Sequence, residues 1–223
     1  MDEVSEATRR NPRAVLFTII GALVVLIATI LYTWAVTYKP AYGSDRTGNS
    51  AVQCTTATGQ MHCTVHLQIQ PAVGVGPHAD YLGYITDTST PHPGTILTLP
   101  RNALVTVIVR NFDSRTALRN PFFTLVQGTI GGQEFVNGKP VKVMSPDLTS
   151  HTFTIPDFGV SVPMEGIPSS GNPSFETMKF TFRTPNRTGV FRWQCIVPCG
   201  YGLYGNGGPM GELGYMGGLI TLT

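Results

Sequence analysis

Sulfur-bearing side chains gather near the C-terminal end of this chain. Cys195 and Cys199 are separated by three residues, and Met210 and Met216 follow in a glycine-rich segment. Thiolate and thioether sulfurs are soft ligands, which suit copper and other thiophilic metals. His151 lies upstream in the segment Ser-His-Thr-Phe-Thr-Ile-Pro and would add an imidazole nitrogen. The residue types therefore make one histidine, two cysteines and a methionine the candidate ligands of a possible copper site.

Composition limits the alternatives. The chain has 223 residues, which suits one domain of ordinary size together with an anchor or a large insertion. Charged residues make up only 13% and the net charge is +2, which is too small to suggest a nucleic-acid partner. With five histidines and four cysteines, few metal sites are possible.

The N-terminal region predicts a membrane anchor. Residues 14–36 contain no charged side chain, and at about 1.5 Å per residue they would cross a hydrocarbon core of about 30 Å. A cleaved signal peptide is the alternative, but its apolar core normally has only about 7–15 residues. Arg9, Arg10 and Arg13 precede the span and only Lys39 follows it closely. This distribution predicts that the helix crosses the cell membrane with its N-terminus in the cytoplasm. We expect a cytoplasmic tail (1–13), a single transmembrane helix (14–38), a linker (39–51) and an extracytoplasmic domain (52–223).

An extracytoplasmic domain would fold where disulfides persist. Cys54 and Cys63 flank a short polar segment with Gly59 at its centre, and we expect a hairpin closed by a Cys54–Cys63 disulfide. The strand that follows alternates apolar and polar residues, which indicates one buried face. His62 and His66 fall on the polar face, where they are interpreted as solvated strand residues.

The rest of the domain has the pattern of an all-β protein. Short alternating runs are separated by Gly, Pro and Asn-Gly turn signals, and helical periodicity is absent beyond the anchor. This predicts a Greek-key β-sandwich or barrel. The candidate strands are residues 81–86, 95–99, 103–112, 122–127, 151–155, 175–182, 190–195 and 219–222.

Three segments together resemble a known family. They are Asn-Ala-Leu-Val-Thr-Val-Ile-Val-Arg-Asn-Phe-Asp (102–113), Ser-His-Thr-Phe-Thr-Ile-Pro-Asp-Phe-Gly-Val (150–160) and Thr-Gly-Val-Phe-Arg-Trp-Gln-Cys-Ile-Val-Pro-Cys-Gly (188–200). Their order and spacing are similar to those of cupredoxins, and more narrowly to subunit II of haem-copper oxidases of the type with a single N-terminal anchor. The resemblance covers residues 100–223 and implies a cupredoxin fold.

The resemblance also implies ligand roles, and the chain departs from some of them. His151 matches the first histidine ligand, and Cys195 and Cys199 match the two bridging thiolates of the dinuclear copper centre, called CuA. Leu203 stands where the family has its second histidine, and no histidine follows His151. Because a dinuclear centre needs two imidazoles, the centre is expected to be lost or altered.

The methionine ligand is displaced as well. Asn206 occupies its expected position, and an insertion beginning at Tyr204 moves the next matching segment to Met216-Gly-Gly-Leu-Ile. Met216 is therefore a better match than Met210 to the family ligand. A second insertion, residues 114–149, precedes His151.

These observations predict a membrane-anchored, cupredoxin-like subunit of a respiratory electron-transfer complex, similar to terminal oxidase subunit II. It would be a non-catalytic or electron-transfer subunit that caps an integral-membrane catalytic subunit, with copper absent or bound in a non-standard way. The glycine-rich segment 200–218 is expected to contact a partner. Two alternatives remain open. One is a stand-alone, tethered blue-copper carrier that serves a redox partner. The other is a copper-free structural or interaction protein of the envelope, with a Cys195–Cys199 disulfide.

Overall fold

A computed structural model describes residues 12–37, 51–88 and 94–223. The chain separates into two compact units, Met1–Gly43 and Ser44–Thr223, and each unit is described by itself. The predicted linker falls almost wholly outside the described residues, as do the N-terminal tail and His92.

The first unit contains helix α1 (Pro12–Thr37), as expected from the uncharged run. Its segment Val15–Thr33 has a mean hydropathy of 2.7, and its described apolar side chains are exposed. A helix that is apolar on all sides has no polar face to turn toward water. The helix is therefore long and apolar enough to serve as a single-pass membrane anchor.

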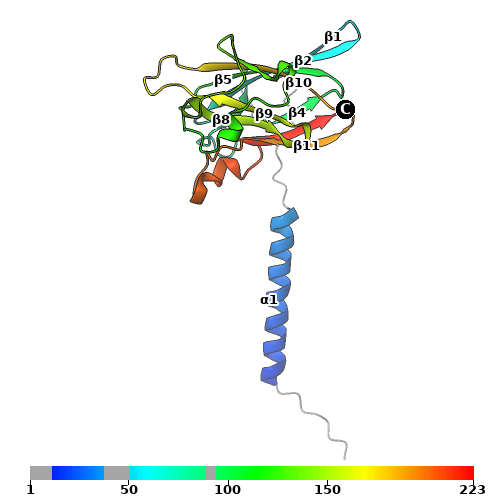
Figure 1. Cartoon of the computed structure of the whole chain (residues 1–223). Helices are drawn as coiled ribbons and strands as arrows, with labels where there is room; N and C mark the ends of the chain where they lie inside the picture. The colour runs from blue at the N-terminus through cyan, green and yellow to red at the C-terminus, as the bar shows by residue number, and fades with distance from the viewer. Residues whose placement is uncertain (1–11, 38–50, 89–93) are drawn as a thin grey trace, which may run out of the picture. The chain divides into compact units, whose positions relative to one another are not determined.

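The second unit is a sandwich of two β-sheets (Figure 1). One sheet has the order β1-β2-β5-β10-β6-β7, with β3 also paired to β2. Its strands are β1 (Val52–Ala57), β2 (Gln60–Gln70), β3 (Gly83–Thr86), β5 (Leu104–Asn111), β6 (Glu134–Val136), β7 (Lys139–Val141) and β10 (Glu176–Arg183). The other sheet has the order β4-β12-β11-β8-β9. Its strands are β4 (Ile96–Leu99), β8 (Thr149–Ile155), β9 (Val160–Glu165), β11 (Gly189–Gln194) and β12 (Gly217–Leu222).

The hydrophobic core lies between the two sheets. In β5, Val105, Val107 and Val109 are fully buried, and Val107 pairs with Phe180 of β10. Trp193 of the facing sheet stacks on a neighbouring phenylalanine ring, and its indole N–H donates to the Thr95 carbonyl at 2.9 Å. The alternation of apolar residues thus builds one core shared by both sheets, and the expected all-β sandwich is confirmed.

Most strand pairs are antiparallel, but each sheet also contains a parallel pair. β2 runs parallel to β5, and β4 runs parallel to β12. β12 pairs with β4 on one side and with β11 on the other, so this strand lies in the interior of its sheet.

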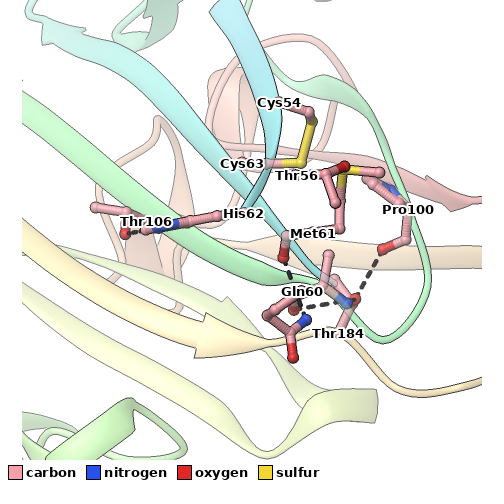
Figure 2. Close-up of a disulfide and its surroundings, with 10 residues drawn as sticks. Cys54, Thr56, Gln60, Met61, His62, Cys63, Pro100, Thr106 and Thr184 are labelled. Atoms are coloured by element: carbon pink, nitrogen blue, oxygen red, sulfur yellow. Dashed lines mark hydrogen bonds between the residues drawn. A yellow bond between two sulfur atoms is a disulfide. The ribbon is translucent and has the colours of Figure 1, made fainter. Parts of the chain in front are cut away.

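The expected hairpin at the start of the domain is also confirmed. β1 and β2 pair with Cys54 opposite Cys63, and the two form a disulfide (Figure 2). His62 points away from the core, and its Nε2 lies 2.8 Å from Thr106 Oγ1 (Figure 2).

Two details of the strand prediction are wrong. Residues 122–127 do not form a strand, because Pro121–Thr124 make a 3-10 turn in which the Phe122 N–H donates to the Asn120 side-chain oxygen. Strand β9 was not expected, since Pro163 interrupts its sequence. Proline is tolerated there because β9 is an edge strand. The Asn137-Gly138 turn is confirmed, and it joins β6 to β7.

Candidate metal centre

Three of the predicted ligands meet at one end of the sandwich. His151 comes from β8, whereas Cys195 and Cys199 come from the loop that leaves β11. β11 pairs with β8 through Gln194 and Thr154, and the Thr152 N–H contacts Cys195 Sγ, so Cys195 lies beside the residue that follows His151. The ligating atoms of His151, Cys195 and Cys199 all lie within 4.8 Å of one another. The structure therefore brings together a histidine and two cysteines that are far apart in the sequence.

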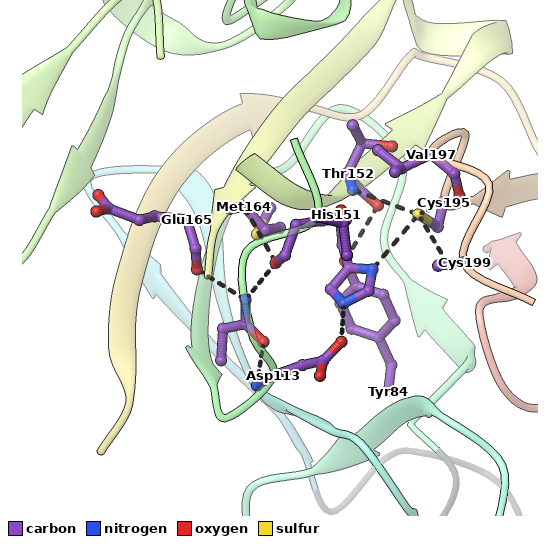
Figure 3. Close-up of polar contacts among 12 residues, drawn as sticks. Tyr84, Asp113, His151, Thr152, Met164, Glu165, Cys195, Val197 and Cys199 are labelled. Atoms are coloured by element: carbon purple, nitrogen blue, oxygen red, sulfur yellow. Dashed lines mark hydrogen bonds and ion pairs between the residues drawn. The ribbon is translucent and has the colours of Figure 1, made fainter. Parts of the chain in front are cut away.

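His151 is fully buried and points into this group with its Nδ1 atom (Figure 3). Nδ1 lies 4.0 Å from Cys195 Sγ, and Nε2 lies 2.8 Å from Asp113 Oδ2 on the opposite side of the ring. A carboxylate on the distal nitrogen fixes the orientation of a metal-binding imidazole. Burial acts to lower the pKa of His151, but the hydrogen bonds with Asp113 and Cys195 outweigh it and raise the pKa to about 9. The ring is thus held with Nδ1 directed at the sulfur atoms.

Cys195 is the centre of the group. Its Sγ accepts a hydrogen bond from the Thr152 N–H at 3.4 Å and lies 3.7 Å from Cys199 Sγ and 3.5 Å from the Val197 carbonyl oxygen. Burial tends to raise the pKa of Cys195, but the Cys199 thiol and His151 lower it well below its usual value. The same contact raises the pKa of Cys199, which donates its proton toward Cys195. Neither cysteine is in a disulfide in this arrangement, and the surroundings of Cys195 favour its thiolate form.

Thr152 and its partners support this sulfur, and the sequence patterns did not indicate their role. The Thr152 hydroxyl accepts a hydrogen bond from the Ile196 N–H at 2.9 Å, which ties the residue after Cys195 to β8. The buried Tyr84 hydroxyl donates to the Thr152 carbonyl at 3.1 Å. Thr152 is the residue after His151, so one short piece of β8 both supplies the imidazole and positions the thiolate.

The two methionines of the loop differ in their relation to the group. Met210 Sδ lies 3.2 Å from Cys199 Sγ. Met216 is buried, and its carbonyl accepts the Cys195 N–H at 2.7 Å. Sequence matching favoured Met216 as the ligand, whereas the methionine sulfur in contact with Cys199 is that of Met210.

The other described histidines lie elsewhere. His62 contacts Thr106, and His78 stacks on Tyr81 with its Nε2 3.7 Å from Glu212. The candidate metal group found among the described residues contains one imidazole, that of His151. Imidazole nitrogens and thiolate sulfurs are donor types that copper accepts.

Comparison with known proteins adds little beyond the architecture. No family model matches the chain, and no curated protein matches it. Solved structures that are similar include rusticyanin from Thiobacillus ferrooxidans, at 15% identity and a TM-score of 0.34, with 78% of this chain and 88% of that chain covered. A chain of a heme-copper terminal oxidase dimer is 14% identical with a TM-score of 0.33, and 94% of this chain and 99% of that chain are covered. At such scores the likeness carries no argument about function. The strand pairing described above is that of a cupredoxin-like β-sandwich, preceded by one apolar helix.

Proposed function

We propose that this protein is a membrane-anchored, cupredoxin-like electron-transfer subunit of a respiratory complex, similar to terminal oxidase subunit II. In place of a dinuclear copper centre it holds an altered site for a single copper ion. The observation that carries the proposal is the buried group of His151, Cys195 and Cys199, whose ligating atoms lie within 4.8 Å of one another.

The donors of this group are suited to copper. An imidazole nitrogen and two thiolate sulfurs favour a thiophilic metal, and copper bound to them would carry one electron at a time. Asp113 Oδ2 lies 2.8 Å from His151 Nε2 and so holds the imidazole with its other nitrogen toward the sulfur atoms. The Thr152 N–H donates to the Cys195 sulfur, and hydrogen bonds around a cysteine sulfur tune the potential of a copper site. These two contacts, one to the imidazole and one to the sulfur, support the proposal that the group still binds a metal.

The position of the site near the surface supports exchange of electrons with a partner. His151 and Cys195 are buried, but Cys199 is only partly buried, and the loop that follows exposes Tyr201 and Tyr204 by 54% and 77%. Aromatic residues are enriched in protein interfaces. Together with the apolar helix α1, these rings suit contact with an integral-membrane subunit that the domain would cap.

The test is purification of the full-length protein, with an affinity tag, from its own membranes in a mild detergent. We expect about one copper per chain and a co-purifying haem-bearing membrane subunit. Electron paramagnetic resonance of the oxidised sample should show one mononuclear Cu(II) signal. Recovery of the protein without any membrane partner would overturn the proposal.

The hydrogen bond from the Thr152 N–H to the Cys195 sulfur favours a second candidate, a stand-alone tethered blue-copper carrier, although the single imidazole of the group is one short of the usual set of two histidines and a cysteine. It predicts copper and thiolate-to-copper absorption in a protein that purifies alone. The copper-free envelope protein is distinguished by metal analysis together with mass spectrometry, which would find no copper and a Cys195–Cys199 disulfide.

A further inference from the structure

A cavity of about 510 Å³ opens beside the candidate metal centre. Ligand-binding cavities in proteins have volumes of about 300–1,000 Å³, so this one is large enough for a small organic molecule. Its lining consists of Thr116, Ala117 and Arg119, then Val197 and Pro198 from the stretch between the two cysteines, and the turn 204–206. The first group belongs to the insertion 114–149 and the last to the insertion that begins at Tyr204, so both insertions meet at this cavity.

One wall of the cavity is bonded to β8, the strand that carries His151. The Thr116 N–H donates to the Thr149 carbonyl at 3.2 Å, and the Thr116 hydroxyl donates to the Ser150 carbonyl at 3.0 Å. Leu118 is buried, whereas Ala117 is exposed and has a φ of 58°. Residues other than glycine rarely adopt this left-handed conformation. The wall is therefore held in one shape although part of its surface faces solvent.

The opposite wall is a closed turn of the glycine-rich segment. Tyr201 and Gly207 exchange two backbone hydrogen bonds, at 3.0 and 2.9 Å. A Cβ atom on Gly205 would lie 3.3 Å from the Pro198 Cβ atom, so the turn packs closely on the cysteine loop. Tyr204, at the tip of the turn, has a φ of 64°. Backbone strain at residues other than glycine is concentrated at functional sites, and both walls of this cavity contain it.

The side chains around the cavity provide one positive charge and one aromatic ring. Arg119 is exposed, and within the described part of the chain it forms no ion pair. Tyr204 is 77% exposed, the Asn206 amide adds a hydrogen-bond donor, and no acidic side chain lines the cavity. A guanidinium group binds a carboxylate through two parallel hydrogen bonds. The tyrosine ring, with Val197 and Pro198, suits the apolar body of the same molecule.

We propose that this cavity binds a small organic carboxylate, with Arg119 on the carboxylate and the Tyr204 ring against the body of the molecule. The site goes beyond the proposed function, because none of its residues is a candidate copper ligand, and it does not require bound copper. Val197 lines the cavity, and its carbonyl oxygen lies 3.5 Å from Cys195 Sγ. An occupant would therefore lie against the loop that carries both cysteines.

The test uses the full-length protein in detergent and 4-fluorobenzoate as the probe, observed by fluorine NMR, with protein-free micelles as the blank. We expect saturable binding of one molecule per chain. 4-Fluorobenzyl alcohol, which has the same ring without the charge, should show no saturable binding. Arg119→Gln should weaken binding of the carboxylate by about 10- to 100-fold, the loss expected when charge-assisted hydrogen bonds are removed. Arg187→Gln is the matched control and should bind as the unchanged protein does, since Arg187 pairs with Asp157 and does not line the cavity.

A second variant tests the cavity without changing a charge. Asn206 is exposed, and the indole of Asn206→Trp would occupy the space, so this variant should lose saturable binding. Equal affinities in Arg119→Gln and Arg187→Gln, or equal binding of the alcohol and the carboxylate, would overturn the inference. Binding of hexaglutamate but not of 4-fluorobenzoate would also overturn it, in favour of an acidic segment of a protein partner.

Discussion

At the scale of single residues, the orientation of one imidazole depends on one carboxylate. Asp113 contacts the His151 nitrogen that faces away from the sulfur atoms. We expect Asp113→Asn to weaken copper binding by about 10- to 100-fold, because the amide no longer holds the ring as a charged acceptor. The measurement is chelator competition on the purified protein. Asp157→Asn is the matched control, since Asp157 is about half-exposed and forms an ion pair with Arg187 rather than with His151. Equal affinities in the two variants would contradict the assigned role of Asp113.

A second residue-scale prediction concerns Thr152, whose hydroxyl accepts the Ile196 N–H. Thr152→Val removes this acceptor and leaves a partly buried N–H without its partner, so the free energy of unfolding should fall by about 1–3 kcal/mol. Thr152→Ser keeps the hydroxyl and should lose less. Chemical denaturation of the metal-free protein measures both values. A Thr152→Val protein as stable as the unchanged protein would contradict the role assigned to this hydroxyl.

The sequence revealed the ligands that lie in recognisable segments, but not the groups that support them. His151, Cys195 and Cys199 could be named because their types and spacing carry the chemistry. Asp113 could not, because it lies 38 residues before His151, and it meets His151 only through the packing of the two sheets against each other. The choice between Met210 and Met216 depended on how an insertion folds, which no spacing rule describes.

At the scale of elements, β6 carries an unusual buried acid. Both carboxylate oxygens of Glu134 are buried without a hydrogen-bond partner among the described residues. Burial, with a smaller effect from Glu165, raises the pKa of Glu134 well above its usual value of 4.5. The folded state therefore favours the protonated acid. Its contribution to stability is fully present below about pH 4.5 and is lost as the pH rises through the folded-state pKa.

We accordingly expect Glu134→Gln to be more stable than the unchanged protein at neutral pH, by on the order of 1–3 kcal/mol. The difference should shrink as the pH falls toward 4.5, because the glutamate is then protonated in both states. Urea denaturation of both proteins across this range gives the difference directly and cancels the titration of the other groups. A difference that is independent of pH would show that Glu134 does not ionise on unfolding.

Another prediction concerns the close approach of the β12 backbone to the residue before β4. A Cβ atom on Gly218 would lie 1.7 Å from the Thr95 carbonyl oxygen, so Gly218→Ala forces two backbones apart. We expect it to lower the free energy of unfolding by about 1–3 kcal/mol, or more if the strands separate. Gly211→Ala is the control, since its Cβ atom would lie 3.6 Å from the Gly208 carbonyl oxygen and the φ of −85° at Gly211 suits alanine. Thermal unfolding compares the two, and equal melting temperatures would contradict the close approach.

Strands were predictable where one face is buried and the other is not. β2 and β10 alternate clearly, and their apolar residues are those found in the core. β9 is mostly buried and contains Pro163, so it shows neither alternation nor an uninterrupted β pattern. Its existence depends on pairing with β8, which is a tertiary effect rather than a local preference.

At the scale of the whole molecule, the described part of α1 is apolar on every side, whereas Ser44–Thr223 forms a compact unit with its own core. We expect the full-length protein to stay in the membrane pellet after alkaline carbonate treatment, and a chain lacking residues 1–43 to appear in the soluble fraction. Immunoblotting of both fractions is the measurement. Extraction of the full-length protein by carbonate would contradict the proposed anchor.

The position of β12 has a consequence for how this protein is made. β12 lies between β4 and β11, and β4 precedes it by more than a hundred residues in the sequence. Until this last strand emerges and inserts, the second sheet is divided, and Met216 is not in place to accept the Cys195 N–H. Such long-range pairing is a late and slow event in folding. The residues of the candidate site would therefore come together only after β12 has inserted, and a metal would be loaded into a finished domain rather than guide its folding.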